Sequence, residues 1–341
     1  MYRIIQNRKI WLSISGVCLA IALIAICLWG VKPGIDFTGG SSLEVQFAGQ
    51  APSTDQVKAA LASLNLQSFT PQPTGNNGMI LRFQNTDETT HQAVITALNK
   101  LVAPATTTAA KAKNTSDLSI IPVGGQNSST VTVQTQAVGS STPAAVTELQ
   151  FSAVGPSIGS ELTKNAVDSI ILVLILIIIY IAYAFRKVSK PLPSWKYGLA
   201  GILALAHDVP MVVGVFAVLG HFYGVEVNTP FIAALLTVLG FSIHDTIVVF
   251  DRVRENLPKS RENFEETVNM SVNQTLVRSI NTSVTVLLVL LSILVFGGES
   301  IRYFALALFM GIFFGTYSSI FLASPLLVIF EKWQHKKTHN S

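Results

Sequence analysis

The chain has 341 residues, of which 50% are hydrophobic and only 12% are charged, and its formal net charge is +4 at pH 7. Soluble domains carry about 25% charged residues, so this composition indicates a membrane protein. It argues against a nucleic-acid-binding protein, because no basic stripe with base-reading partners is present. It also argues against a disulfide framework, because the two cysteines, Cys18 and Cys27, lie nine residues apart in one apolar run.

Apolar runs long enough to cross a membrane occur six times in the sequence. They cover residues 10–31, 166–185, 198–220, 229–250, 279–297 and 303–330. Each is close to or above the ~20 residues that a helix needs to cross a bilayer. The runs are continuous rather than alternating, which predicts transmembrane helices and not the strands of a barrel. The first run lacks a convincing small-x-small cleavage site, so we interpret it as a retained anchor and not as a signal peptide.

Lysine and arginine are concentrated in alternate connections between the predicted spans. The basic residues before the first span and after the second, fourth and sixth are Arg3, Arg8, Lys9, Arg186, Lys187, Lys190, Lys196, Arg252, Arg254, Lys259, Arg261, Arg278, Lys332, Lys336 and Lys337. On the other side, 221–228 has no basic residue and 298–302 has only Arg302. The positive-inside rule therefore predicts that both termini are cytoplasmic.

The long connection between the first two spans, residues 32–165, is predicted to form an external α+β domain. In chain order, the patterns predict a strand at 42–47, a helix at 53–65, a strand at 79–83, a helix at 86–101 and a strand at 145–154. This order fits a ferredoxin-like sandwich in which one further strand is not recognised. Asp36 stands close to a pair of glycines at the start of this region, a setting that is typical of a turn residue.

Residues 103–143 are dominated by Thr, Ala, Ser, Gly and Gln, which predicts a low-complexity insertion that is partly disordered. Within it, 116–123 and 129–138 are candidates for a hairpin. The predicted organisation is the N-terminus with the first helix (1–31), the external domain (32–165), five further helices (166–331) and a basic cytoplasmic tail (332–341).

Two packing patterns occur towards the C-terminus. Residues 263–276 predict an amphipathic helix at the membrane interface, which serves either as a connection or as a docking face. Its apolar residues recur every four positions: Phe264, Val268, Val272 and Leu276. Asn263 and Glu266 fit a capping box at its start. In the sixth span, Gly311 and Gly315 form a G-x-x-x-G pattern, which permits close helix packing.

Ionisable side chains lie inside or at the edge of three predicted spans. Asp208 follows His207 in the third span, Asp245 follows His244 in the fourth, and Arg278 opens the fifth. An ionised side chain at the membrane centre costs about 2.5–3.5 kcal/mol on insertion scales, so such residues are candidates for function. The residues that share one helical face with Arg278 are Asn281, Thr282, Thr285 and Ser292.

Asp245 and Arg278 begin near the same membrane face on consecutive antiparallel spans, so an ion pair between them is geometrically possible. A carboxyl group that can pair or be protonated is a candidate proton carrier, and the alternative is a static clamp between two helices. Asp208 is a second candidate, after Asp245. His207 and His244 are interpreted as hydrogen-bond partners of the aspartates that follow them rather than as relay members, and His244 is kept as a further relay candidate. The two His-Asp dipeptides lack the other ligands of a zinc or iron site, so neither a metal nor another cofactor is predicted.

Four segments resemble the SecD/SecF family of protein-export membrane proteins, within the resistance-nodulation-division superfamily. They are GIDFTGGSSLEVQF (34–47), VGPSIGSEL (154–162), ALAHDV (204–209) and GFSIHDTIVVFDRVREN (240–256). The resemblance covers nearly the whole chain except 103–143, and the layout of six spans with one large external loop looks like that of SecF members. The signature residues that it assigns are Asp36, Phe37, Gly39, Gly40, Gly155, Pro156 and Gly159.

The resemblance implies a proton-driven accessory to secretion and not an enzyme. It implies partnership with a SecD-like subunit, with the SecYEG channel and with the SecA motor, and unfolded exported polypeptides as clients, in the plasma membrane of a prokaryote. Protons would be the coupling ion. In the family pattern, Asp245 matches the relay acid, Arg278 the arginine of the fifth span and Thr282 a polar position one turn further on. His244 departs from the pattern, which more often has an amide there, and leaves the choice between protons and other cations open.

Two other functions are compatible with parts of the sequence. An intramembrane aspartyl protease would use Asp208 and Asp245 as a pair that shares a proton, but the chain lacks a G-x-G-D segment. A small-molecule exporter of the same superfamily usually has two six-span halves and two large external loops, whereas this chain has one of each. The half-size layout predicts an obligatory partner, by analogy with that superfamily.

Overall fold

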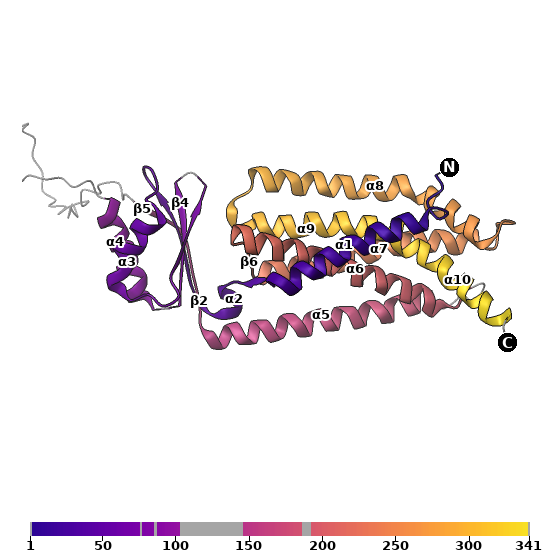
Figure 1. Ribbon diagram of the computed structural model, residues 1–341, viewed down its shortest axis with the longest axis horizontal. Coiled ribbons are helices and arrows are strands. Elements are labelled where there is room, and N and C mark those ends of the chain that lie inside the picture. Colours follow the sequence, from indigo (N-terminus) through magenta and orange to yellow (C-terminus); the bar gives the residue numbers. More distant parts are fainter. Residues whose placement is uncertain (1, 76, 85–86, 103–145, 186–191, 340–341) are drawn as a thin grey trace, which may run out of the picture. The chain divides into compact units, whose positions relative to one another are not determined.

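The computed structural model describes residues 2–75, 77–84, 87–102, 146–185 and 192–339 (Figure 1). The chain forms two compact units, one of Met1–Gly39 with Pro156–Ser341 and one of Gly40–Gly155. The second unit, called the external unit after the side of the membrane that the sequence predicts for it, is shorter at both ends than the predicted 32–165, because the segments that flank it pack with the helices. The predicted insertion and its candidate hairpin lie outside the described residues.

The larger unit is a bundle built around six helices that are long and apolar enough to cross a membrane. They are α1 (Arg8–Trp29), α5 (Pro156–Ala184), α6 (Ser194–Tyr223), α7 (Thr229–Asn256), α8 (Phe264–Phe296) and a sixth made of α9 (Glu299–Ser318), the π-helical turn η2 (Ser319–Ala323) and α10 (Ser324–His339). All six predicted spans are confirmed. The start of α1 and the end of α10 lie at the same end of the bundle (Figure 1).

The predicted separate amphipathic helix at 263–276 is wrong, because α8 runs without a break from Phe264 to Phe296. Its apolar stripe is buried inside the bundle, where Val268 and Val272 pack with Ile5 and Val249. The predicted start is correct, since Asn263 Oδ1 accepts a hydrogen bond from the Glu266 backbone N–H at 2.9 Å. The apolar pattern that predicts a surface helix therefore belongs to the first part of a long helix, which is buried against the N-terminal segment and α7.

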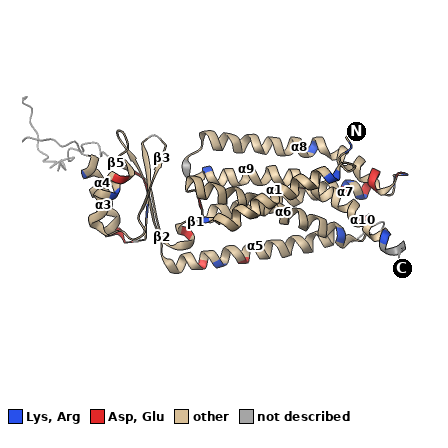
Figure 2. Ribbon diagram, in the orientation of Figure 1, with Lys and Arg blue, Asp and Glu red and all other residues tan. Residues whose placement is uncertain are grey.

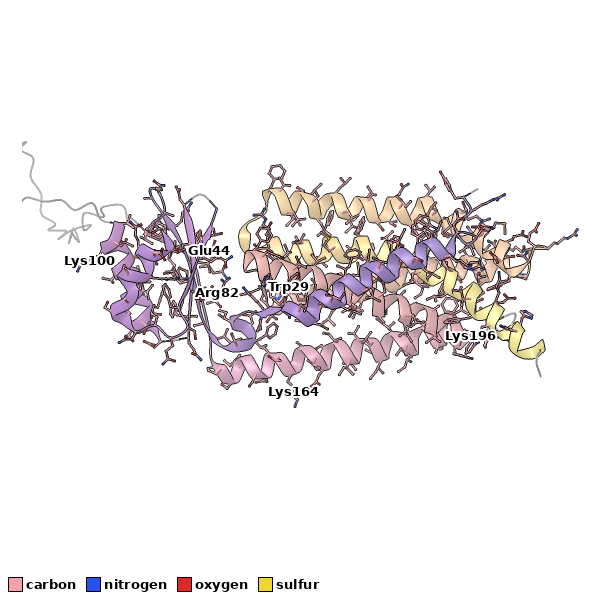
Figure 3. The ribbon with its side chains drawn as sticks, viewed as in Figure 1. Trp29, Glu44, Arg82, Lys100, Lys164 and Lys196 are labelled. Carbon is pink, nitrogen blue, oxygen red and sulfur yellow. The ribbon has the colours of Figure 1, made fainter. Side chains whose placement is uncertain are left out.

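The end of the bundle that holds both termini is fastened by charged and polar contacts. Most of the bundle's Lys and Arg gather towards this end (Figure 2). The Glu265 carboxylate pairs with Arg8 Nη1 at 2.6 Å and with Lys332, so it joins the starts of α1 and α8 to α10. Lys196, labelled at the start of α6 in Figure 3, donates to Gln334 Oε1 at 2.6 Å and to the Phe330 carbonyl at 3.3 Å.

Small residues allow the helices to approach closely, as the G-x-x-x-G pattern predicts. An ideal Cβ on Gly311 would lie 2.1 Å from Val238 Cγ2, so α9 packs directly against α7 at this position. One turn further on, a Cβ on Gly315 would lie 2.9 Å from Ser242 Cβ. The α7–α9 contact is therefore built on glycine, and it brings the backbone of α9 against the α7 segment that precedes Asp245.

The external unit consists of β2 (Gly40–Phe47), α3 (Thr54–Leu61) with a 3₁₀ turn, β3 (Thr70–Thr74), β4 (Gly78–Phe83), α4 (Glu88–Val102) and β5 (Val146–Val154). The strands form an antiparallel sheet in the order β3-β4-β2-β5, which is the ferredoxin-like arrangement that the sequence predicts. The strand missed at sequence level is β3, because Pro71 and Pro73 hide the strand pattern. As an edge strand, β3 tolerates both prolines.

The α1–α6 contact is testable through Gly214. An ideal Cβ there would lie 2.7 Å from Ala22 Cβ and 2.8 Å from Ala22 Cα. Because the obstacle is the α1 backbone, we expect Gly214→Ala to destabilise the chain by about 1–3 kcal/mol. Gly240→Ala is the matched control, since no heavy atom lies within 4 Å of its Cβ position. Unfolding of the two purified variants in detergent measures the difference, and equal midpoints would contradict the close α1–α6 packing.

Candidate functional site

The Asp208 carboxylate is the centre of a buried hydrogen-bond network in the middle of the bundle. Its residue is 0% exposed on α6. Oδ1 lies 3.0 Å from Nδ1 of His207, and Oδ2 accepts hydrogen bonds from Ser242 Oγ on α7 at 2.6 Å and from Ser318 Oγ on α9 at 2.7 Å. Removal from water is costly for a carboxylate unless such donors replace the lost hydration. Asp208 therefore joins three helices, and both of its oxygens have partners.

A second layer of hydroxyl groups extends the network to the π-helical turn η2. Ser319 Oγ lies 2.8 Å from Thr246 Oγ1 and 3.2 Å from the Ser242 carbonyl oxygen. Ser324 Oγ donates to the Ser319 carbonyl at 3.0 Å. Single π-helical turns inside longer helices are frequent at functional sites, because they add a residue and free backbone groups from the regular pattern. Ser319, the first residue of the turn, therefore contacts α7, whereas Ser318 just before it binds Asp208 on α6.

Asp245 lies one helical turn after Ser242 and is bound much less completely than Asp208. It is 4% exposed. The hydroxyl groups of Ser279 on α8 and Thr316 on α9 lie near its carboxylate, as do the charges of His244 and Arg278. The buried atoms of the described residues that have no hydrogen-bond partner include Asp245 Oδ2 and Ser279 Oγ, and also Nε2 of His207, whose Nδ1 lies beside Asp208. Asp245 is therefore a membrane-buried carboxyl group with an open oxygen beside an open hydroxyl.

The predicted ion pair between Asp245 and Arg278 is not formed in the part of the chain that the structure describes. Arg278 is exposed on α8, and His244 is exposed on α7. Thr282 follows one turn after Arg278, and its Oγ1 donates to the Arg278 carbonyl at 3.0 Å. The other residues of the polar face, all exposed, are Asn281, Thr285 and Ser292. The chain thus presents a polar stripe, defined here as Arg278, Asn281, Thr282, Thr285 and Ser292, on a helix of membrane-spanning length.

The signature residues meet where the chain passes between its two units. The helical turn α2 (Ile35–Thr38) contains Asp36 and Phe37. An ideal Cβ on Gly159, in the first turn of α5, would lie 2.9 Å from the Phe37 carbonyl oxygen and 3.0 Å from the Gly39 backbone nitrogen. Gly39 and Gly40 have φ values of 74° and 127°, which favour glycine. The two signature segments, more than 100 residues apart, therefore pack against each other.

Asp36 itself is more than the turn residue that its sequence context indicates. Its Oδ2 accepts a hydrogen bond at 2.8 Å from the backbone N–H of Thr229, the first residue of α7. Beside it, β1 (Lys32–Pro33) pairs with β6 (Glu226–Val227) as two short parallel strands. The segment after α1 is thus bonded to the segment that leads into α7.

Sequence reasoning found the ionisable residues of the site but missed its hydroxyl groups. The missed residues are Ser242, Thr246, Ser279, Ser318 and Thr316. Their signal was present, because Ser242 precedes Asp245 by one turn and Ser318 follows Gly315 by three residues. Small hydroxyl residues are common in apolar helices, however, where they can bond to their own backbone. Among the described residues, no three His, Cys, Asp or Glu side chains gather as a metal ion would require.

Comparison with known proteins gives concordant results. Residues 133–333 match the family described as "Protein export membrane protein SecD/SecF, C-terminal", and residues 30–51 match the "SecD/SecF GG Motif". The protein translocase subunits SecF of Thermobaculum terrenum and Anaerolinea thermophila are 39% and 36% identical, over 98% of this chain and 95% and 96% of their own lengths.

The crystal structure of SecDF from Thermus thermophilus, described as a translocon-associated membrane protein, is similar with a TM-score of 0.74 at 30% identity. The match covers 97% of this chain and 39% of that longer chain. The family model spans more than half of the sequence, and the SecF relatives match almost all of it. The chain therefore belongs to the SecD/SecF family of protein-export membrane proteins, on its SecF side.

Proposed function

We propose that the protein uses the proton-motive force, together with a SecD-like subunit, to assist the export of unfolded polypeptides across the plasma membrane. The observation that carries this proposal is Asp245, a buried carboxyl group on a membrane helix with one oxygen left without a partner. Family membership makes it a transport protein and a subunit of the export machinery. The coupling ion, the cytoplasmic position of both termini and cooperation with the SecYEG channel and SecA belong to the proposal.

In this proposal, Asp245 gains and loses one proton in each cycle. The ionised carboxylate needs a donor or a cation, and the candidates within reach are the hydroxyls of Ser279 and Thr316 and the charge of Arg278. The protonated carboxyl needs none of these, so neutralisation removes the attraction between α7 and α8. A proton that crosses the membrane releases about 2.3 kcal/mol per 100 mV, so a few protons can drive a conformational change.

Asp208 has the opposite role in the proposal, that of a fixed anchor. Three side chains of α6, α7 and α9 converge on its two oxygens: Ser242 and Ser318 donate, and His207 Nδ1 lies at hydrogen-bond distance. A change of charge there would leave several buried groups without partners at once, which is costly in an apolar interior. Asp208 and His207 thus hold the helices that surround Asp245 in place while Asp245 titrates.

The polar stripe of α8 supports an obligatory partner. Arg278 and its four polar neighbours are exposed on the isolated chain, and a lipid tail offers none of them a hydrogen bond. A second set of membrane helices would cover the stripe and the nearby exposed His244. The Thermus thermophilus protein named SecDF is a longer chain, of which this chain matches 39%. A SecD-like subunit is therefore the partner that the proposal assigns to this face.

The two other candidate functions receive less support. A protease of the aspartyl type needs two carboxyl groups that share a proton. Asp208 is instead bonded to His207, Ser242 and Ser318, and no hydrogen bond joins it to Asp245 within the described chain. A small-molecule exporter remains the second candidate by superfamily, and export assays with polypeptide clients distinguish the two.

The relay role of Asp245 predicts that Asp245→Asn abolishes gradient-dependent export and leaves assembly intact, because an amide resembles the protonated acid but cannot release a proton. The measurement is client export into inverted membrane vesicles with and without a proton gradient. Asp251→Asn is the matched control, since Asp251 lies on the same helix but is exposed and paired with Arg254 at 3.1 Å. Normal gradient-dependent export by Asp245→Asn would remove the basis of the proposed function.

The anchor role of Asp208 predicts a different outcome for Asp208→Asn. Its amide nitrogen or oxygen must replace an oxygen that accepts two hydroxyl hydrogen bonds, so we expect a loss of about 3–5 kcal/mol in stability together with lost export. Ser318→Ala removes one donor and should cost about 1–2 kcal/mol. Unfolding of the purified variants in detergent measures both. An Asp208→Asn protein as stable as the parent but without export would show that Asp208 carries protons.

The partner face predicts where photo-crosslinks form. A photoreactive residue at Asn281, in the polar stripe, should crosslink to the SecD-like subunit in native membranes. The matched control is Ile280, which is 44% exposed on the same helix but points away from the stripe. It should react mainly with lipid. Equal crosslinking from both positions, or crosslinking from Ile280 alone, would place the partner elsewhere.

A further inference from the structure

We propose that Asp36 is a positioning residue that couples α7 to the joint between the membrane unit and the external unit. The inference deepens the proposed function, since it assigns the route by which a change at Asp245 reaches the outer domain. It rests on three sets of contacts, all within the membrane unit.

The first set joins Asp36 to α7. The N-terminal residues of a helix have backbone N–H groups without partners inside the helix, and a carboxylate there is favoured by hydrogen bonding and by the helix dipole. At the start of α7, Asn228 Oδ1 accepts from Phe231 N–H at 3.2 Å, and Pro230 has no N–H. The Thr229 N–H is bonded at 2.8 Å to Asp36, 193 residues earlier in the chain. The cap of α7 is thus shared between a local residue and a distant one.

The second set fixes the Asp36 segment to the loop before α7. Lys32 pairs with Glu226 and Pro33 with Val227, and the Gly34 N–H donates to the Val227 carbonyl at 2.7 Å. An ideal Cβ on Gly34 would lie 3.1 Å from the same carbonyl oxygen, so the two segments are in close contact. The start of α7 and the segment that follows α1 therefore move as one body.

The third set connects this body to the joint. The chain passes between its units at Gly39–Gly40 and at Gly155–Pro156. Asp36 lies in the turn α2, three residues before the first crossing. This turn packs against Gly159, which lies four residues after the second crossing. The positive φ values of Gly39 and Gly40 let the backbone turn sharply at the first crossing. The first covalent link to the external unit thus leaves from the segment that Asp36 anchors, and the second leaves from the first turn of α5, which packs against that segment.

The distance between the two ends is bridged by one helix. α7 runs unbroken from Thr229 to Asn256, and Asp245 lies 16 residues after Thr229, about 24 Å along the axis. A helix transmits a shift or rotation along its length, because its backbone bonds hold the turns together. A displacement of α7 caused at Asp245 would therefore reach Thr229, and the Asp36 carboxylate would pass it to the two crossings.

The test measures coupling directly by amide hydrogen exchange on the full chain in lipid nanodiscs. Asp245→Asn, which imitates the neutral acid, should change exchange of the peptides around 34–42 and 150–160 by about fivefold in the parent background. In the Asp36→Ala background, the same Asp245→Asn change should leave those peptides unaltered. Asp36→Ala alone should raise exchange at Thr229 about tenfold, through loss of a charged acceptor.

Asn228→Ala is the matched control. It removes the other side-chain cap of α7 and leaves the Asp36 segment untouched, so the fivefold response to Asp245→Asn should survive it. If Asp36→Ala does not fold, Asp36→Asn retains an acceptor oxygen without the charge and should give a reduced but measurable response. Equal loss of the response in Asn228→Ala and in the Asp36 variants would show a general cap and not a specific coupling.

Two further outcomes overturn the inference. In one, the joint responds to Asp245→Asn equally with and without Asp36. In the other, the joint does not respond even in the parent background. Neither depends on an export assay, so the inference can fail while vesicle export still supports the relay role of Asp245. Conversely, normal export by Asp245→Asn would overturn the proposed function, and the coupling through Asp36 would then be decided by the exchange measurement alone.

Discussion

A carboxylate inside a membrane protein persists only if donors replace its lost water or a proton cancels its charge. The bundle buries two carboxyl groups on the neighbouring helices α6 and α7, and their surroundings differ. Asp208 receives Ser242, Ser318 and His207, whereas Asp245 retains an oxygen without a partner. Close packing at Gly315 brings α9 against Ser242 of α7, and Ser242 and Ser318 of these two helices supply the hydroxyl groups that bind Asp208. One buried acid thus has partners on both oxygens, and the other keeps an oxygen without a partner.

Local chemistry determined most of the architecture, which is why it was predictable. Continuous apolar runs gave all six spans, and alternation or helical spacing gave five elements of the external unit. The failures have identifiable causes. Two prolines concealed β3, and the inner end of α8 resembled an interfacial helix because its apolar stripe packs on Ile4, Ile5 and α7, which are far away in sequence. The local sequence around a residue does not show which distant residues it will contact in the fold.

At the site too, the sequence shows which ionisable residues are present but not which residues they contact. The sequence identified Asp208, Asp245 and Arg278, since charge in an apolar run is conspicuous. It could not show that both oxygens of Asp208 have partners, or that Arg278 lies on the exposed side of α8. The partner of Asp36 was equally hidden, because Thr229 is 193 residues away. Ser242 and Ser318 were passed over since hydroxyl residues carry no charge to mark them.

The β3 edge of the external sheet has a consequence for how this sheet can pair with other chains. Open sheet edges recruit extended polypeptides through their backbone donors and acceptors. At two of the five positions of β3, a proline replaces the donor, so this rim offers an incomplete ladder to any passing strand. The two prolines that hide β3 in the sequence therefore also make this edge a poor template for the addition of another strand.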